Sequence, residues 1–317
     1  MLPPNNPNIP LGNYLLKLRK DIKIIGVSSI LKDWHGGLSQ TYNTASKKIG
    51  ISESFYRAFV SGRLAIPIWA LKLLFKIDAE LPNKIYRQPN IYFTARNKRD
   101  SLPKSINPKL AYYIGYLHGD GHIDSNKKRI SFFDKYIGQL KVINELTKLL
   151  FNVEGSIRIR KNKFFNSETP TLDIRRVTIN SFLSDVIGIK RGKRSSNEVP
   201  CIIKKNKILL KWYLCGLFDA EGAMPLNPKK RGDIYIDIAM KDIKLIGSVK
   251  ILLESNFDIH SYGPYKRIAR NPKFKKITIE SELKIRKLSE IKKFLNIIGA
   301  MHPDKVRRKE LILSLLN

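Results

Sequence analysis

The chain has 317 residues, 43% of them apolar, which is enough to fill the cores of two or three domains and excludes a disordered chain. Lysine and arginine number 59 against 27 aspartates and glutamates, and the resulting net charge of +32 favours a polyanionic partner, nucleic acid first. No long uncharged apolar span supports a membrane partner, and Cys201 and Cys215 form neither a zinc knuckle nor a disulfide framework. The Pro/Asn-rich residues 1–10 do not resemble a secretory signal, so we expect an intracellular protein, in a prokaryotic cytoplasm or in an organelle.

Residues 1–82 are predicted to form a small all-α domain, because apolar residues recur at helical spacing and no convincing strand is seen. Within it, residues 46–63 resemble a helix-turn-helix of the phage-repressor type, in which Gly50 makes the turn and Ser52 caps the second helix. As a five-helix-type bundle the domain would add a second DNA contact; because such patterns are short, a small helical bundle used only for packing is the alternative. The residues expected on the exposed, DNA-contacting face are Ser54, Phe55 and Arg57.

Residues 83–106 are basic, interrupted by prolines and poorly periodic, which is typical of a linker that is solvated or follows phosphates. The rest of the chain divides into two blocks, 107–197 and 198–317, that share one plan. Each block begins with an apolar helix, continues with a strand, a lysine and an amphipathic helix, and then has two further strands and a closing helix. The order predicts an α+β fold of two pseudo-symmetric α-β-β-α-β-β-α half-domains.

The first helix of each half-domain carries the most informative motif. The segments Tyr113-Ile-Gly-Tyr-Leu-His-Gly-Asp-Gly121 and Leu214-Cys-Gly-Leu-Phe-Asp-Ala-Glu-Gly222 are offset by 101 residues (222 − 121). Each places a carboxylate in the last turn of a helix, against the negative end of the helix dipole, followed by a glycine suited to a left-handed cap. A carboxylate there is unfavourable without a cation, and its duplication indicates a paired cation site.

Small residues at four-residue spacing lie on one face of each motif helix, which would let the two helices approach closely. These are Gly115 with Gly119, and Gly216 with Ala220. Close approach would bring Asp120 and Glu221 side by side, where they repel unless divalent cations lie between them. Hard cations with oxygen ligands are also what phosphodiester hydrolysis requires.

The two segments resemble the dodecapeptide motif of LAGLIDADG homing endonucleases in their single-chain, two-motif form. The resemblance covers about residues 107–317 and implies paired motif helices at the interface of two half-domains, whose sheets form a saddle on DNA. It implies that Mg2+ or Mn2+ binds at Asp120 and Glu221, beside Gly119 and Ala220. It also implies a basic residue near the reacting water, and Lys135 and Lys241 stand at that place, 15 and 20 residues after their carboxylates (135 − 120 and 241 − 221).

Strand alternation and this resemblance together predict the surface that contacts DNA, since a basic two-stranded ribbon fits the major groove. The expected contacts from the two sheets are Arg129, Arg158, Arg160, Arg175, Tyr235, Asp237, Lys266, Arg267 and Lys276. The partner would be double-stranded DNA with a long target, pseudo-palindromic or asymmetric, bound by a monomer.

Other sites and functions compete with this interpretation. His118 and His122 suggest zinc, but Gly119 and Gly121 weaken the helix that would align them. Glu282 and Lys284 fit the E-x-K part of a restriction-type site, and no P-loop is present. The chain has neither a nucleophile at residue 1 nor a His-Asn end, so we expect a freestanding protein rather than an intein. An intron RNA maturase and a catalytically silent DNA-binding regulator remain as alternatives on the same scaffold.

Overall fold

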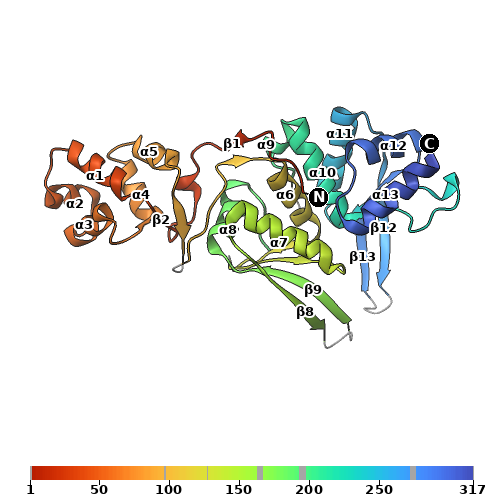
Figure 1. Ribbon diagram of the computed structural model, residues 1–317, viewed down its shortest axis with the longest axis horizontal. Helices are drawn as coiled ribbons and strands as arrows, with labels where there is room; N and C mark the ends of the chain where they lie inside the picture. Colours follow the sequence, from red (N-terminus) through yellow and green to blue (C-terminus); the bar gives the residue numbers. More distant parts are fainter. Residues whose placement is uncertain are drawn as a thin grey trace.

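The computed structural model describes residues 2–95, 98–126, 128–162, 167–192, 198–271 and 276–316. Three units follow one another along the long axis: an N-terminal domain, a first half-domain and a second half-domain (Figure 1). In the part of the chain described, no helix is long and apolar enough to cross a bilayer.

The N-terminal domain contains the expected helix-turn-helix. Gly50 ends the first helix of the motif with a φ of 76°, and the Ser52 hydroxyl caps the second by accepting the Phe55 amide at 3.4 Å. Both residues therefore act as the sequence predicts. The helices are α1 (Ser28–Gly37), α2 (Tyr42–Ile49), α3 (Glu53–Ser61), α4 (Ile68–Phe75) and α5 (Leu81–Arg87), with a 3-10 turn η1 (Leu15–Lys17) before them.

This domain is not all-α, because it also holds a three-stranded antiparallel sheet of order β3-β2-β4. Its strands β2 (Lys23–Ile25), β3 (Ile66–Pro67) and β4 (Tyr92–Thr94) have only two or three residues each. Strands of that length cannot display the period-two alternation by which a strand is recognised in a sequence. The sequence therefore predicts the helices and misses the sheet.

Residues 83–106 do not form a simple linker. They contain most of α5 and the strand β4, and Asp100 pairs with Arg176 at 3.0 Å in the first half-domain. Strand β5 (Ser105–Ile106) pairs with β1 (Ile9–Pro10), so the start of the chain lies along the first half-domain rather than in the N-terminal domain. The stretch is poorly periodic because its elements are short.

The first half-domain has the predicted order, with an antiparallel sheet β6-β7-β9-β8 covered by α7. The last strand of this sheet ends at Ile174 and is followed by a short helix. The elements are α6 (Pro108–Asp120), β6 (Gly121–Ile123), β7 (Ile130–Phe133), α7 (Ile137–Phe151), β8 (Ser156–Asn162), β9 (Ser167–Ile174), α8 (Val177–Ser181) and a π-helical turn η2 (Phe182–Val186).

The second half-domain repeats this arrangement, with a sheet of order β10-β11-β13-β12 covered by α11. Two helices in it were not predicted, α9 and α13. Its elements are α9 (Cys201–Lys204), α10 (Lys207–Glu221), β10 (Gly222–Ala223), η3 (Arg231–Asp233), β11 (Ile236–Met240), α11 (Ile243–Phe257), β12 (Tyr262–Asn271), β13 (Lys276–Ile285), α12 (Leu288–Ile297) and α13 (Pro303–Leu316). The mixed α+β fold of two half-domains is thus confirmed.

The motif helices α6 and α10 pack directly against each other between the half-domains. A Cβ added to Gly115 would lie 2.0 Å from the carbonyl oxygen of Tyr213, and one added to Gly216 would lie 2.2 Å from that of Tyr112. The two contacts are related by the 101-residue offset (216 − 115 and 213 − 112). Glycine at both positions therefore sets how closely the two backbones approach.

We expect Gly115→Ala to destabilise the protein by roughly 1–3 kcal/mol or more, because the added methyl group meets a backbone carbonyl that a rotamer change cannot move. Urea unfolding would measure the loss. Gly247→Ala is the matched control, since Gly247 lies within α11 and its added Cβ meets nothing within 4 Å. That control should gain up to about 1 kcal/mol from helix propensity. Equal effects of the two substitutions would contradict the close-approach argument.

Candidate active site

The carboxylates Asp120 and Glu221 are the last residues of α6 and α10. The glycines that follow do not form left-handed caps as the sequence predicts: Gly121 has φ −94° and Gly222 φ −79°, both extended. Glycine is needed there for space, because an added Cβ at Gly121 would lie 2.7 Å from the Leu117 carbonyl oxygen. The chain can thus turn from each helix directly into the first strand of its sheet.

Two hydrogen bonds cross between the motif helices and are related by the same pseudo-symmetry. The Tyr112 hydroxyl on α6 donates to Asp219 Oδ2 on α10 at 2.7 Å, and the Tyr213 hydroxyl on α10 lies 2.7 Å from His118 Nδ1 on α6. All four side chains are buried. Residues 118 and 219, two places before the terminal carboxylates, therefore fasten the helix ends together.

Zinc at His118 would need further protein ligands around it. Among the residues that the structure describes, no group of three or more His, Cys, Asp or Glu side chains is arranged to hold a metal ion. A pair of carboxylates is nevertheless a suitable donor set for Mg2+, which keeps several waters and is bound in enzymes by one or two carboxylates together with substrate phosphates. Asp120 and Glu221 fit such a site, and the zinc alternative does not fit.

The electrostatics of Asp120 also indicate a missing positive charge. Burial, together with the nearby charges of Glu221 and Asp134, raises the pKa of its carboxyl to about 8, while Lys305 acts in the opposite direction. A carboxyl in this state is neutral below about pH 8 and becomes charged when a cation binds beside it. Asp120 and Glu221 at the two helix ends therefore repel each other when both are charged, and a bound cation would reduce this repulsion.

The two carboxylates open into separate pockets. Asp120 lines a pocket of about 430 Å³ with Asp134, Lys135 and residues of α13, and Glu221 lines one of about 370 Å³ with Lys241. Each predicted lysine therefore lies in the same pocket as the predicted carboxylate of its own half-domain. The structure brings these four residues together in two pairs, and their catalytic roles stay predictions.

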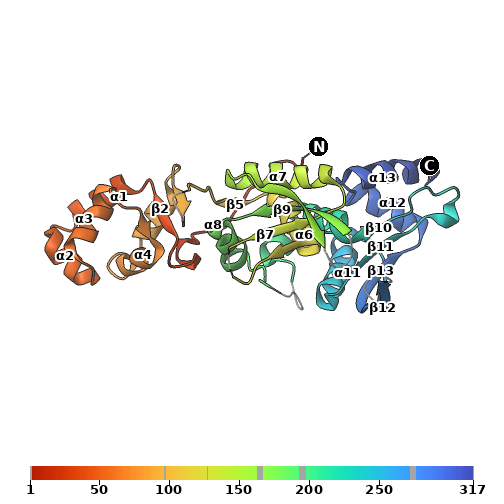
Figure 2. The same cartoon turned by 90° about the horizontal axis from the view of Figure 1, so that it is seen from below.

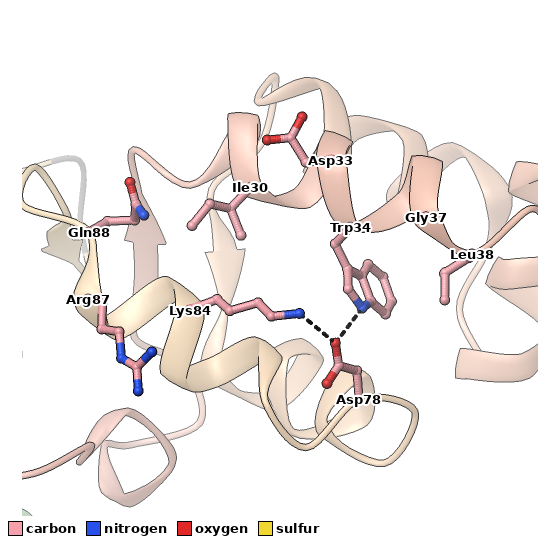
Figure 3. A pocket seen from close by; sticks show the side chains of 9 residues that line it. All are labelled: Ile30, Asp33, Trp34, Gly37, Leu38, Asp78, Lys84, Arg87 and Gln88. Atoms are coloured by element: carbon pink, nitrogen blue, oxygen red, sulfur yellow. Dashed lines mark hydrogen bonds and ion pairs between the residues drawn. The ribbon is translucent and has the colours of Figure 1, made fainter.

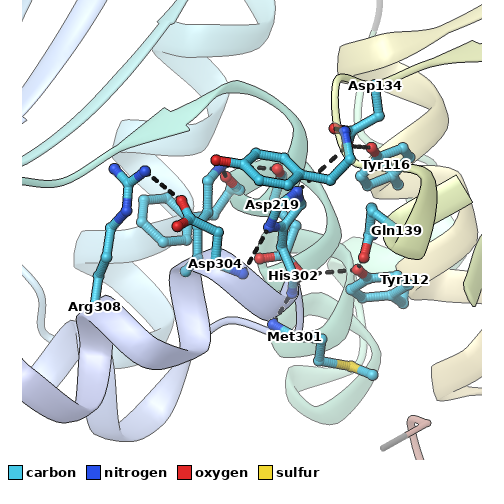
Figure 4. Close-up of polar contacts among 12 residues, drawn as sticks. Tyr112, Tyr116, Asp134, Gln139, Asp219, Met301, His302, Asp304 and Arg308 are labelled. Atoms are coloured by element: carbon cyan, nitrogen blue, oxygen red, sulfur yellow. Dashed lines mark hydrogen bonds and ion pairs between the residues drawn. The ribbon is translucent and has the colours of Figure 1, made fainter. Parts of the chain in front are cut away.

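A polar network missed by the sequence lies beside the Asp120 pocket (Figure 4). Asp219 Oδ2 accepts the backbone amides of Met301 and His302 at 2.9 Å, and His302 Nε2 lies 3.4 Å from Asp134 Oδ2. Burial raises the pKa of Asp134, but hydrogen bonds from His302 and Tyr116 outweigh this effect and hold it below its usual range. These contacts join the C-terminal segment to both half-domains.

Residues 301–316 gave no signal in the sequence because they follow the last element of the repeat. Two cations of α13 nevertheless enter the site region. Lys305 donates to backbone carbonyls of α10, and Arg308 donates to the Met224 carbonyl at 3.0 Å and pairs with Asp304. Only a comparison of the two halves, showing that the second is longer at its end, would have drawn attention to them.

One face of the first sheet carries polar side chains, and strand register places Arg158 and Arg160 on it, whereas Arg129 and Arg175 lie one residue outside the strands β7 and β9. Arg158 lies opposite Thr171, and Arg160 opposite Thr169. Arg160 also pairs with the buried Asp173 at 2.8 Å, which fixes its guanidinium across the face.

The second sheet agrees with the prediction only in part. Asp237 and Arg267 lie on its polar face, the first paired with Arg286 at 2.6 Å, and Tyr235 lies beneath the Arg286 guanidinium. Lys266 pairs in register with Ser281 and so faces the opposite side of the sheet from Arg267. The β-bulge between Tyr262 and Tyr265 shifts the alternation, and it contains Gly263 and Pro264, residue types that are typical of bulges. The side chain of Lys276 lies outside the described residues.

The E-x-K pair proves to be part of this sheet. Glu282 lies on β13 and forms ion pairs with Lys284 at 3.0 Å and Arg267 at 3.2 Å. Glu282 does not line either motif pocket. A row of neighbouring ion pairs along a strand explains the three residues without a restriction-type site.

In the N-terminal domain, Ser54 and Phe55 are exposed on α3, and 54% of the Phe55 surface is accessible. Arg57 is held within the domain, by a 2.7 Å ion pair with Glu53 and by stacking over the Tyr42 ring. All three predicted residues are therefore exposed on the helix-turn-helix, with the Arg57 side chain held in place by these two contacts.

The same domain has a groove of about 750 Å³ between α1 and α5 (Figure 3). At its base, Asp78 accepts the Trp34 indole N–H at 3.0 Å and lies 3.5 Å from the Lys84 ammonium. These contacts tie α1 to α5 and explain the polar residues there as structural.

Comparison with known proteins supports the class that this geometry defines, an α+β protein of two half-domains joined by paired helices. Residues 209–299 match the family model described as a LAGLIDADG-like domain. The match runs from α10 to just beyond α12, and the first half-domain repeats the same order of elements. Residues 209–299 of the chain therefore contain a LAGLIDADG-like domain.

Two curated relatives come from Methanocaldococcus jannaschii. Its glutamine–fructose-6-phosphate aminotransferase (isomerizing) is 27% identical over 279 residues, which make up 87% of this chain and 24% of that protein. Its replication factor C small subunit is 27% identical over 137 residues, 43% of this chain and 7% of that protein. The chain therefore matches only a limited part of each relative.

Solved structures with a similar arrangement include full-length DUF199/WhiA from Thermatoga maritima, with 17% identity, a TM-score of 0.43 and coverage of 65% of this chain and 60% of that one. The homing endonuclease I-WcaI bound to its DNA recognition sequence has 14% identity, a TM-score of 0.45 and coverage of 64% and 85%. I-DmoI in complex with DNA and Mn has 18% identity, a TM-score of 0.41 and coverage of 62% and 98%.

The raised pKa of Asp120 makes stability depend on pH. Because the folded-state pKa is raised from 3.8 to about 8, this carboxyl contributes stability below about pH 4 that is lost as the pH rises toward 8. Asp120→Asn removes that loss, so relative to wild type it should gain roughly 1–3 kcal/mol between about pH 5 and about pH 8 without divalent ions.

Urea unfolding at the two pH values measures this gain. Asp33→Asn, an exposed site on α1, is the control and should give the same difference between the two pH values as wild type. An Asp120→Asn variant that loses as much stability as wild type over this interval would show that Asp120 is not buried against like charges.

Proposed function

We propose that this protein is a site-specific double-strand DNA endonuclease that uses divalent metal. The observation that carries the proposal is the placement of Asp120 and Glu221 at adjacent helix ends, each in a pocket with its own lysine. Burying like charges side by side costs stability, and this cost is explained if the pair serves a reaction that needs cations. Two equivalent pockets fit one cut in each strand of a duplex.

Mg2+ or Mn2+ held by Asp120 and Glu221 would supply an activated water and would stabilise the leaving oxygen of the phosphodiester. The chain's own residues would position the DNA and move protons around that centre. The Lys135 and Lys241 side chains are exposed at the two pockets, where each can donate to a phosphate oxygen or orient the attacking water. The pseudo-symmetry then directs the two pockets at opposite strands.

The shape of the molecule supports duplex DNA as the substrate. The β8–β9 and β12–β13 hairpins project to the same side of the motif helices, as Figures 1 and 2 show. Arg158 and Arg267 lie exposed on these hairpins, in a chain with a net charge of +32. Two such ribbons, one from each half-domain, suit two stretches of major groove in a long target.

The curated relatives support a unit that moves between genes. Nearly nine tenths of this chain matches a quarter of an aminotransferase, and a shorter part matches a small fraction of a replication factor subunit. Two proteins with unrelated names share this unit only as a segment. A homing endonuclease, which cuts DNA at its own insertion site, accounts for that distribution, whether it is freestanding or carried within a host protein.

A silent DNA-binding regulator or an intron RNA maturase would use the same basic sheets and the helix-turn-helix. Neither needs two acidic side chains at adjoining helix ends, each in a pocket with a lysine. The paired carboxylates therefore favour the endonuclease.

Selection of cleaved sites from a randomised DNA library with Mg2+ tests the proposal. Wild type should enrich one long sequence cut on both strands, while Asp120→Asn and Glu221→Gln should each lower double-strand cutting by a factor of about 10² or more, because each removes a metal ligand. Binding of the selected site in Ca2+ is the control and should persist in both variants. Tight binding of one sequence by wild type without any cutting would instead identify a regulator.

The exposed face of α3 is expected to extend the target beyond the saddle. Phe55→Ala should weaken binding of the selected site by roughly 5-fold to 100-fold, since an exposed aromatic ring at a recognition helix contacts thymine methyl groups. Competition binding against a site with substitutions at its outer end would locate the contact. Lys72→Ala, exposed on α4, should weaken all sequences equally and slightly. A Phe55→Ala variant with unchanged affinity would assign α2 and α3 to packing alone.

A further inference from the structure

A lysine from the C-terminal helix reaches the centre of the motif helix ends. Lys305 Nζ donates to the carbonyl oxygens of Phe218 at 2.6 Å and Asp219 at 2.7 Å, in the last turn of α10. The same ammonium lies 5.1 Å from the centre of the Phe218 ring. It also lines the Asp120 pocket. A cation at this place compensates the negative end of the α10 dipole.

The charges of four carboxylates act on the Lys305 side chain. Burial lowers the pKa of Lys305, and the nearby charges of Asp219, Asp120, Asp134 and Glu221 raise it, so that they favour the ammonium form. In return, Lys305 opposes the upward shifts of the Asp120 and Asp219 pKa values that burial produces. Without Lys305, the mutual repulsion of these carboxylates would lose this compensating charge.

The Glu221 pocket is built differently. Its lining includes Lys241 from the turn after β11, and α13 contributes no residue to it. Lys241 is exposed, whereas Lys305 is largely enclosed between α13 and α10. The two pockets are thus pseudo-symmetric in their carboxylate and their surface lysine. Among the described lining residues, the Asp120 pocket has in addition Lys305, which caps the end of α10.

We propose that Lys305 is the resident cation of the Asp120 half-site, where it takes the electrostatic place of a divalent ion against Asp120 and Asp219 while it caps α10. Lys305 is a positioning residue, because it acts on the carboxylates and not on the DNA. The Asp120 half-site is therefore neutralised in part before any metal binds. The inference rests on the proposed function only in naming this a metal half-site.

A double-mutant cycle in metal-free buffer tests the charge coupling. Lys305→Met should raise the unfolding equilibrium constant by about a hundredfold or more, because it leaves buried carboxylates uncompensated. Adding Asp120→Asn should recover at least about tenfold more stability in the Lys305→Met background than in wild type. Arg307→Met is the control: it removes one charge from the exposed face of the same helix and should change the constant by no more than about twofold.

If Asp120→Asn has the same effect in both backgrounds, Lys305 is only a cap of α10 and the proposal is overturned. A second measurement separates a cap from a substitute for metal. Ca2+ should raise the melting temperature of Lys305→Met more than that of wild type, since the vacated place attracts a divalent ion, and an equal rise would overturn the proposal. Neither measurement uses DNA or cleavage, so failure of the endonuclease hypothesis in the library selection would be seen separately.

Discussion

The close contact between α6 and α10 is the constraint on which the rest of the structure depends. Gly115 and Gly216 each lie against a carbonyl of the opposite helix, and neither position has room for a methyl group. Tyr112 of α6 and Tyr213 of α10 then form hydrogen bonds with residues near the end of the other helix. The distance between the helices is therefore set by backbone atoms, which cannot yield as side chains can, and the carboxylates at the helix ends have a fixed separation.

That fixed separation creates an electrostatic problem which the fold solves in stages. Two helix dipoles, two terminal carboxylates and the buried Asp219 all concentrate negative charge in one place. Backbone amides of Met301 and His302, the Tyr112 hydroxyl and the Lys305 ammonium remove part of it. The raised pKa of Asp120 shows that compensation is incomplete, and the remainder is what makes this place suited to a divalent cation.

The sequence predicted what repeats. Motif helices, the strand and helix after them, and the pairs of Asp120 with Lys135 and Glu221 with Lys241 could all be found because each occurs twice at matching places. What it missed has no partner copy: the short strands β2, β3 and β4 lack periodicity, and α13 follows the end of the repeat. In the β12–β13 hairpin, Lys266 and Arg267 are neighbours on one strand and therefore face opposite sides of the sheet, and the bulge at Gly263 and Pro264 decides which of the two lies on the polar face.

The crossed tyrosines have a consequence for recombination. Each half-domain supplies a glycine that makes room for the backbone of the other half and a tyrosine hydroxyl that forms a hydrogen bond with it. The surfaces of the two motif helices are therefore complementary to each other. A chimera that exchanged one half for that of a relative would keep the hairpin of the retained half. It would take the other hairpin, and with it a new recognition specificity, from the relative. It would fold stably only if the incoming motif helix brought a compatible glycine and an acceptor for the tyrosine of the retained half. The contact between α6 and α10 therefore decides whether such an exchange gives a stable protein.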